Sequence, residues 1–281
     1  MRRNFAQILK EAKIDIKSEY QKLYGMLYDR SIQVSSTKWI SAYDELSSCF
    51  LGFYFRGTCL SIEEFNDVNG FHFEKEPEPF SIDNLILLCE YIKNMLMGYQ
   101  NAQHAYPMLQ PAINVQFYLM QIAQVIEKIG YMSLNQDGFV IYVEKSPAAI
   151  SVAESEQIPK EISYKMISYN HYNMKGNLQE KKNTILKLAE LLEAKRPELD
   201  KVDNRFCNDI FYLFNNLNIR HNNIDSSING KFKRAVADMP PEELEHWYDE
   251  TYQMCLLAFL RLEQADRKIE FDKLKNIIEN T

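Results

Sequence analysis

The sequence has 281 residues, a net charge of −7 and only nine glycines and nine prolines, although 46% of its residues are hydrophobic. So few turn-forming residues favour long helices and argue against a sandwich or barrel built from many short strands. The negative charge argues against a protein that binds nucleic acid over its whole surface.

The first half of the chain predicts four amphipathic helices, at residues 3–29, 36–55, 81–99 and 111–129, because apolar residues recur at three- and four-residue spacings. Trp39 is assigned to the inward face of the second helix. Residues 61–80 carry six acids against one lysine, and their prolines and Gly70 exclude a continuous helix. We interpret that segment as a long, partly ordered connection.

After residue 130 the spacing of apolar residues changes from a helical period to an alternating one. Residues 131–143 alternate in β-branched and aromatic side chains around Asp137-Gly138, which predicts a β-hairpin. After it, further helices are expected at about 148–154, 159–173 and 178–195. The predicted fold is all-α in the main, a helical bundle with one small hairpin. It divides into a helical region at 1–130, a hairpin connection at 131–146 and a helical domain at 147–281. The alternative is that these regions pack together as a single unit.

The most informative stretch runs from Asp203 to Glu263 and reads as helix, polar connection, helix. Asp203 or Asn204 can cap the first helix, whose apolar pattern stops at Leu217. The second helix begins at Pro240-Pro241 and continues through acidic residues to an apolar stripe that includes Trp247. Arg220 and His221 are therefore expected in the last turn of the first helix or just beyond it.

The polar connection offers a plausible phosphodiester site. Arg220 can grip a phosphate and offset charge in a transition state, and His221 can move a proton. Asn218, Asn222 and Asn223 can bind substrate and orient the two. A ribose 2′-hydroxyl as internal nucleophile removes the need for a metal. The surrounding residues 201–235 are basic, with six cations against three acids.

Two antiparallel helices with an Arg and a polar residue near their junction resemble the HEPN superfamily (higher eukaryotes and prokaryotes nucleotide-binding). The resemblance covers about residues 158–266, with Arg220 at the position of the family's Arg and His221 at that of its polar residue. It implies an all-α, dimeric domain that handles RNA or a nucleotide, and for many members a metal-independent endoribonuclease of toxin–antitoxin or phage-defence systems. The partners implied are RNA or a nucleotide, a second copy of the chain, and an antitoxin or other protein.

The family's second histidine would fall at 225–227, where the chain has Asp and two Ser. His171, on a predicted helix that could pack against the central pair, is a further catalytic candidate. Its alternative is a structural histidine bonded to the backbone. For Arg220 and His221 the alternative is a helix-capping network, with Arg220 paired to Asp225 or a nearby Glu. A metal site from His171, His221 and Asp225 is disfavoured, because the HExxH and i,i+4 His spacings are absent.

No cofactor motif such as a Gly-rich phosphate loop is present, and none is expected. The five cysteines lack CxxC spacing and favour reduced thiols in a cytoplasmic protein. The longest apolar runs are about seven residues, too short for a membrane span, and no signal peptide is evident. The alternative function is a catalytically inactive interaction module that binds a protein or nucleotide. Its contact surfaces would be the acidic 61–80 segment and the hairpin.

Overall fold

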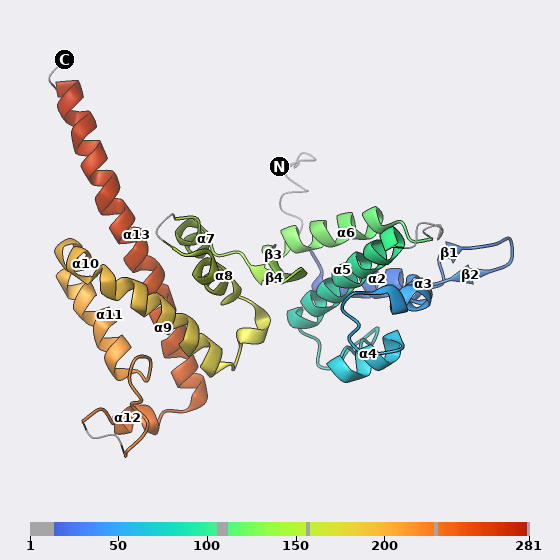
Figure 1. Ribbon diagram of the computed structural model, residues 1–281, viewed down its shortest axis with the longest axis horizontal. Coiled ribbons are helices and arrows are strands. Elements are labelled where there is room, and N and C mark those ends of the chain that lie inside the picture. Colours follow the sequence, from blue (N-terminus) through green and yellow to red (C-terminus); the bar gives the residue numbers. More distant parts are fainter. Residues whose placement is uncertain (1–13, 106–111, 156–157, 228–229, 280–281) are drawn as a thin grey trace, which may run out of the picture. The chain divides into compact units, whose positions relative to one another are not determined.

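The computed structural model describes residues 14–105, 112–155, 158–227 and 230–279. Over these residues the chain is mainly α-helical, with two small two-stranded sheets (Figure 1). The predicted fold class is confirmed, including the small hairpin. The chain divides into two compact units, unit 1 at residues 1–142 and unit 2 at 143–281. None of the helices described is long and apolar enough to cross a membrane.

Unit 1 is built around one long helix, α5. Its residues Leu85, Ile86, Ile92 and Leu96 are each at most 1% exposed, and helices from both earlier and later parts of the unit pack against it. The elements of unit 1 in chain order are α2 (Ile16–Tyr28), β1 (Ile32–Gln33), β2 (Trp39–Ile40), α3 (Ala42–Cys49), η1 (Phe50–Gly52), α4 (Ile62–Asn69), α5 (Ile82–Ala105), α6 (Val115–Lys128), β3 (Tyr131–Gln136) and β4 (Phe139–Glu144).

The predicted helix at 36–55 is wrong in its first part. Residues 32–33 and 39–40 pair as the antiparallel β1–β2 sheet, and α3 begins only at Ala42. Ser41 caps α3, because its Oγ accepts from the Asp44 backbone N–H at 3.0 Å while the Asp44 carboxylate accepts from the Ser41 N–H at 2.9 Å. Trp39 consequently lies outside the helix and is 49% exposed.

The 61–80 segment is also more ordered than predicted. Ser61 caps a short helix, α4, and Gly70 ends it in the left-handed conformation with φ of +72°. The first predicted helix is described only from α2 onward, since residues 1–13 lie outside the described part. The hairpin is confirmed, and Asp137 and Gly138 both have positive φ, as a type I′ turn requires.

Unit 2 is a helical bundle in which the long C-terminal helix α13 packs along α9 and also contacts α7, α10 and α11 (Figure 1). Buried side chains from these helices, among them Ile185, Leu188, Phe214 and Phe259, form one core. The elements in chain order are α7 (Pro147–Ala153), α8 (Lys160–Ser168), η2 (Tyr172–Met174), α9 (Leu178–Ala194), α10 (Arg196–Val202), α11 (Asn204–Asn216), α12 (Arg234–Ala237) and α13 (Pro241–Glu279).

Candidate functional site

The polar connection of the central stretch begins where α11 ends. Asp203 caps the start of α11, since its Oδ1 accepts from the Phe206 N–H at 3.0 Å. Asn218, two residues after the last helical residue, has a φ of +55°, a conformation that asparagine tolerates better than most residues. The chain then turns back, and the Arg220 N–H donates to the Phe214 carbonyl at 3.0 Å. Arg220 and His221 thus lie just beyond the helix.

Asn223 fixes the loop formed by residues 217–227 and 230–233, called the Asn-rich loop below. Its side chain is fully buried; Nδ2 donates to the Lys231 carbonyl at 2.7 Å and the Asn215 carbonyl at 3.2 Å. Its Oδ1 accepts from the Asn218 N–H at 2.8 Å, and the Asn218 Oδ1 accepts from the Asn223 N–H at 3.3 Å. Two distant parts of the loop are therefore tied to the end of α11.

This network bears on the predicted role of Asn218, Asn222 and Asn223 in binding substrate. Asn218 and Asn223 are buried, and their side chains hold the loop. The Asn218 side chain also bonds to the buried Tyr248 hydroxyl; burial raises the pKa of Tyr248 to about 12, and this hydrogen bond opposes the rise. Of the three residues predicted to bind substrate, Asn222 is the exposed one. Asn218 and Asn223 therefore fix the conformation of the loop, and Asn222 is the asparagine left exposed to a ligand.

Arg220 projects from the Asn-rich loop toward α9. Its Nη1 lies 2.5 Å from Glu193 Oε2, and the two side chains are 29% and 40% exposed. The capping alternative named Asp225 or a Glu as the partner; the structure shows Glu193, while Asp225 Oδ1 accepts from the Ser227 N–H and hydroxyl. An exposed ion pair of this kind contributes about 0–1 kcal/mol, so Arg220 can exchange Glu193 for another anion at little cost.

His221 is half-buried beside two cations. Partial burial lowers the pKa of His221, and the positive charges of Lys231 and Arg220 lower it further. The imidazole is therefore mainly neutral at pH 7 and able to accept a proton. Lys231 is exposed, and its backbone carbonyl is bonded to Asn223, so Arg220, His221 and Lys231 all belong to the Asn-rich loop. We call these three residues the basic cluster.

His171 is held elsewhere in unit 2. It caps η2, its Nδ1 accepts from the Asn173 N–H at 3.3 Å, its ring packs on Tyr172, and it is 6% exposed. It precedes the first turn of α9, whereas Arg220 contacts the last turn. Because a helix rises about 1.5 Å per residue, the stretch from Leu178 to Glu193 spans about 22 Å. The structure does not bring His171 and Arg220 together.

A metal site is not formed by these residues. Within the described part of the chain, no three His, Cys, Asp or Glu side chains are grouped so that they could hold a metal ion.

Sequence reasoning missed an ionic network between α9 and α13. Lys181 is only 5% exposed, and its Nζ lies 2.7 Å from both Glu245 and Asp249. The Tyr169 hydroxyl donates to the same Asp249 at 2.8 Å, and its ring stacks on Tyr252 at 3.9 Å. Lys181 shares the helical spacing of Ile185, Leu188 and Leu192, which could have placed it on the buried face. Since its charge is matched by two carboxylates, this network is structural.

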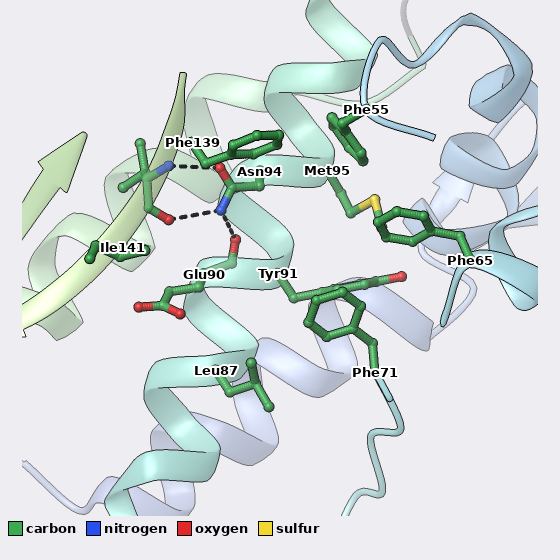
Figure 2. A pocket seen from close by; sticks show the side chains of 11 residues that line it. Phe55, Phe65, Phe71, Leu87, Glu90, Tyr91, Asn94, Met95, Phe139 and Ile141 are labelled. Atoms are coloured by element: carbon green, nitrogen blue, oxygen red, sulfur yellow. Dashed lines mark hydrogen bonds between the residues drawn. The ribbon is translucent and has the colours of Figure 1, made fainter. Parts of the chain in front are cut away.

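Unit 1 contains an aromatic pocket of about 200 Å³. In Figure 2 the rings of Phe55, Phe65 and Phe71 gather near Tyr91 and Met95 of α5. Ring centroids are 5.6 Å apart for Phe55 and Phe65, and 5.4 Å for Phe71 and Tyr91. The hairpin completes the wall with residues 139–141.

The polar side chains of the aromatic pocket bond to other parts of unit 1, since Asn94 and Glu90 hold the hairpin and Tyr91 holds α4. Asn94 Nδ2 donates to the Val140 carbonyl and Asn94 Oδ1 accepts from the Val140 N–H, both at 2.8 Å (Figure 2). Glu90 accepts from the Tyr142 N–H at 2.7 Å, and the Tyr91 hydroxyl donates to Asn66. The surface that remains for a ligand is apolar and aromatic.

Comparisons with protein-family models, with curated proteins and with solved structures found no match for this chain.

Proposed function

We propose that unit 2 binds RNA or a nucleotide through the phosphate group, at the basic cluster. The supporting observation is that Arg220, His221 and Lys231 lie on one loop whose backbone is fixed by Asn223. The charges of Lys231 and Arg220 also lower the pKa of His221. Arg can bind phosphate through two parallel hydrogen bonds, and Lys adds a point charge. Without a ligand Arg220 forms an ion pair with Glu193, and a bound phosphate displaces Glu193.

In a catalytic form of this proposal, the protein is a metal-independent, HEPN-like endoribonuclease of a toxin–antitoxin or phage-defence system, acting as a homodimer and restrained by an antitoxin or other protein. Neutral His221 takes the proton from a ribose 2′-hydroxyl, the 2′-oxygen attacks phosphorus, and the 5′-oxygen leaves with a proton from water. Arg220 offsets the charge on the phosphoryl oxygens. His171 has no part in this step within one subunit.

The binding proposal is tested with a fluorescently labelled single-stranded RNA and the full chain, by anisotropy at low salt. Arg220→Ala should weaken binding by about tenfold, which corresponds to ~1.4 kcal/mol. Glu193→Gln should strengthen it, because the competing carboxylate is gone and Arg220 is free. Affinity should also fall as salt rises.

The matched control is Lys187→Ala, which removes an exposed cation paired with Glu190 on the same helix. It should leave the affinity unchanged. If Lys187→Ala and Arg220→Ala weaken binding equally, RNA binds through the net charge of the surface and not at the basic cluster, and the proposal fails. Cleavage is followed on the same RNA in EDTA; His221→Ala should stop it while binding persists.

A second candidate function is favoured by the aromatic pocket: an interaction module that accepts an apolar side chain of a protein partner. The two segments expected to form contact surfaces, 61–80 and the hairpin, line this one pocket through Phe65, Phe71 and Phe139. The 61–80 segment supplies six acids, Glu63, Glu64, Asp67, Glu74, Glu76 and Glu78. A partner with an aromatic residue between basic ones therefore suits it best.

The probe for this candidate is the peptide Lys-Lys-Trp-Lys-Lys, compared with Lys-Lys-Ala-Lys-Lys in calorimetry. Only the Trp peptide should bind, and Ile141→Trp, which fills the pocket, should abolish its binding. Leu51→Trp adds the same ring at an exposed position outside the pocket and should have no effect. Equal binding of both peptides would reduce the interaction to charge attraction and exclude the pocket.

A further inference from the structure

The C-terminal half of α13 carries apolar side chains that the described part of unit 2 does not cover. Phe271, Leu274 and Ile278 are 54%, 50% and 67% exposed. In Figure 1 this part of the helix continues beyond the rest of unit 2. Single exposed apolar residues are ordinary, but three at three- and four-residue spacing form a stripe along one face. A stripe of this kind indicates a helix that packs against a partner.

The stripe is part of a seven-residue pattern. Written as heptads abcdefg, the a positions are Leu257, Gln264, Phe271 and Ile278, and the d positions are Leu260, Arg267 and Leu274. Earlier in the helix the opposite positions face the core: Ala258, Phe259 and Leu262 are at most 5% exposed, whereas Leu257 is 42% exposed. Leu260 packs against the core of unit 2, and Arg267 borders a hollow that it shares with α7. From Gln264 onward the a and d positions are all exposed, and they form a seam along the C-terminal part of α13.

The charges beside the seam select the partner and its direction. Position g holds Glu263 and Glu270, and position e holds Lys268 and Lys275. In a parallel pair of identical helices each g residue faces an e residue of the other helix, which here gives Glu–Lys pairs. An antiparallel pair would set Glu against Glu and Lys against Lys. The pattern is therefore self-complementary in the parallel orientation only.

The current contacts of these residues are compatible with such a pair. Lys275 Nζ lies 4.8 Å from the centroid of the Phe271 ring, which keeps its stem along the seam. Arg267 is paired within its own helix to Glu263 at 3.2 Å, which offsets one charge at a seam position. Gln264 and Arg267 are polar seam residues, which fix register at some expense of stability.

We propose that two copies of this chain associate through residues 263–278 of α13, as a parallel, in-register coiled coil. The surface is separate from the basic cluster and does not depend on RNA binding. Pairing removes Phe271, Leu274 and Ile278 from water in both copies and brings Glu270 of each helix to Lys275 of the other.

The first test measures the mass of the full chain by light scattering at micromolar concentrations. A dimer is expected, and Leu274→Lys should convert it to a monomer. Glu270→Lys and Lys275→Glu should each raise the dimer dissociation constant by about tenfold or more, and the double variant should restore it because the pairs are re-formed with exchanged signs. A monomeric wild type, or a dimer that survives Leu274→Lys, would overturn the proposal.

The orientation is tested by disulfide formation. Ile278→Cys places a thiol in the seam, where only a parallel pair brings the two copies of position 278 together. Lys273→Cys is the control. Residue 273 is at position c, outside the seam, and its thiol should not cross-link. The native cysteines give little background, since four are buried and Cys49 is partly buried. A dimer in which Lys273→Cys cross-links as readily as Ile278→Cys would exclude the parallel seam.

Discussion

At the scale of residues, the Asn-rich loop shows one side-chain type in three roles. Asn218 adopts positive φ at the end of α11, Asn222 is exposed, and Asn223 is buried with its amide fully used. The sequence indicates a polar connection after Leu217, and that prediction is confirmed. It cannot tell the three apart, because the partners of Asn223 lie five and eight residues away and depend on how the turn closes.

The buried amide of Asn223 leads to a prediction about stability. Asn223→Ala removes three side-chain hydrogen bonds and leaves the Lys231 and Asn215 carbonyls without that donor. We expect a loss of about 3 kcal/mol in the free energy of unfolding, because unsatisfied buried groups cost about 1–3 kcal/mol each and losses overlap. Urea unfolding followed by circular dichroism measures this loss.

Asn222→Ala is the matched control for this prediction. The residue is adjacent and of the same type but exposed, so its replacement should change stability by less than about 0.5 kcal/mol. If both variants were equally stable to urea, the hydrogen bonds of Asn223 would not be what holds the loop, and the preorganisation of the basic cluster would lose its physical basis.

At the scale of elements, the helix ends and turns that are predicted correctly are those that depend on neighbouring residues. The cap at Asp203, the apolar period of α11, and the Asp137-Gly138 turn all depend on residues within a few positions of one another, and the structure has each of them. The short helices α10 and α12 are not predicted. Leu199 and Val202 are the large apolar residues of α10, and α12 spans four residues, so neither helix shows a helical period.

The errors occur where two local signals compete. Ser36 and Thr37 look like helix caps, yet Ser41 with Asp44 forms the capping box that starts α3. Trp39 and Trp247 were both assigned to apolar faces, and they are 49% and 39% exposed. Hydrophobic period alone favours burial of any large ring, whereas the actual exposure depends on which neighbouring elements cover that face.

Functional sites depend on contacts that sequence spacing does not reveal. Glu193 and Arg220 are 27 residues apart and belong to different elements. The aromatic pocket combines the 61–80 segment, α5 and the hairpin. The sequence predicts contact surfaces at the 61–80 segment and the hairpin, but not the contribution of α5. The sequence predicts His171 on a helix that could pack against the central pair, but the length of α9 lies between His171 and Arg220.

At the scale of the whole molecule, the two units each bury their own set of apolar side chains. Leu85 of α5 and Ile185 of α9 are both 0% exposed, and each lies within the core of its own unit. The division at residues 142 and 143 falls within β4, so a single hairpin strand carries the chain from one unit to the other. The proposed division into 1–130, 131–146 and 147–281 stays a prediction.

Separate cores lead to the last prediction. Leu85→Ala should lower the stability of unit 1 by about 2–5 kcal/mol, the usual cost of a cavity in a packed core, and Ile185→Ala should do the same to unit 2. Amide hydrogen exchange of the full chain, followed by mass spectrometry, reports each unit separately. Leu85→Ala should speed exchange in peptides from α2, α5 and α6, and Ile185→Ala in peptides from α9, α11 and α13. If either substitution accelerated exchange to the same extent in all of these peptides, the two cores would unfold as one cooperative unit. In that case a substitution that destabilises unit 1 would also destabilise the loop that carries Arg220.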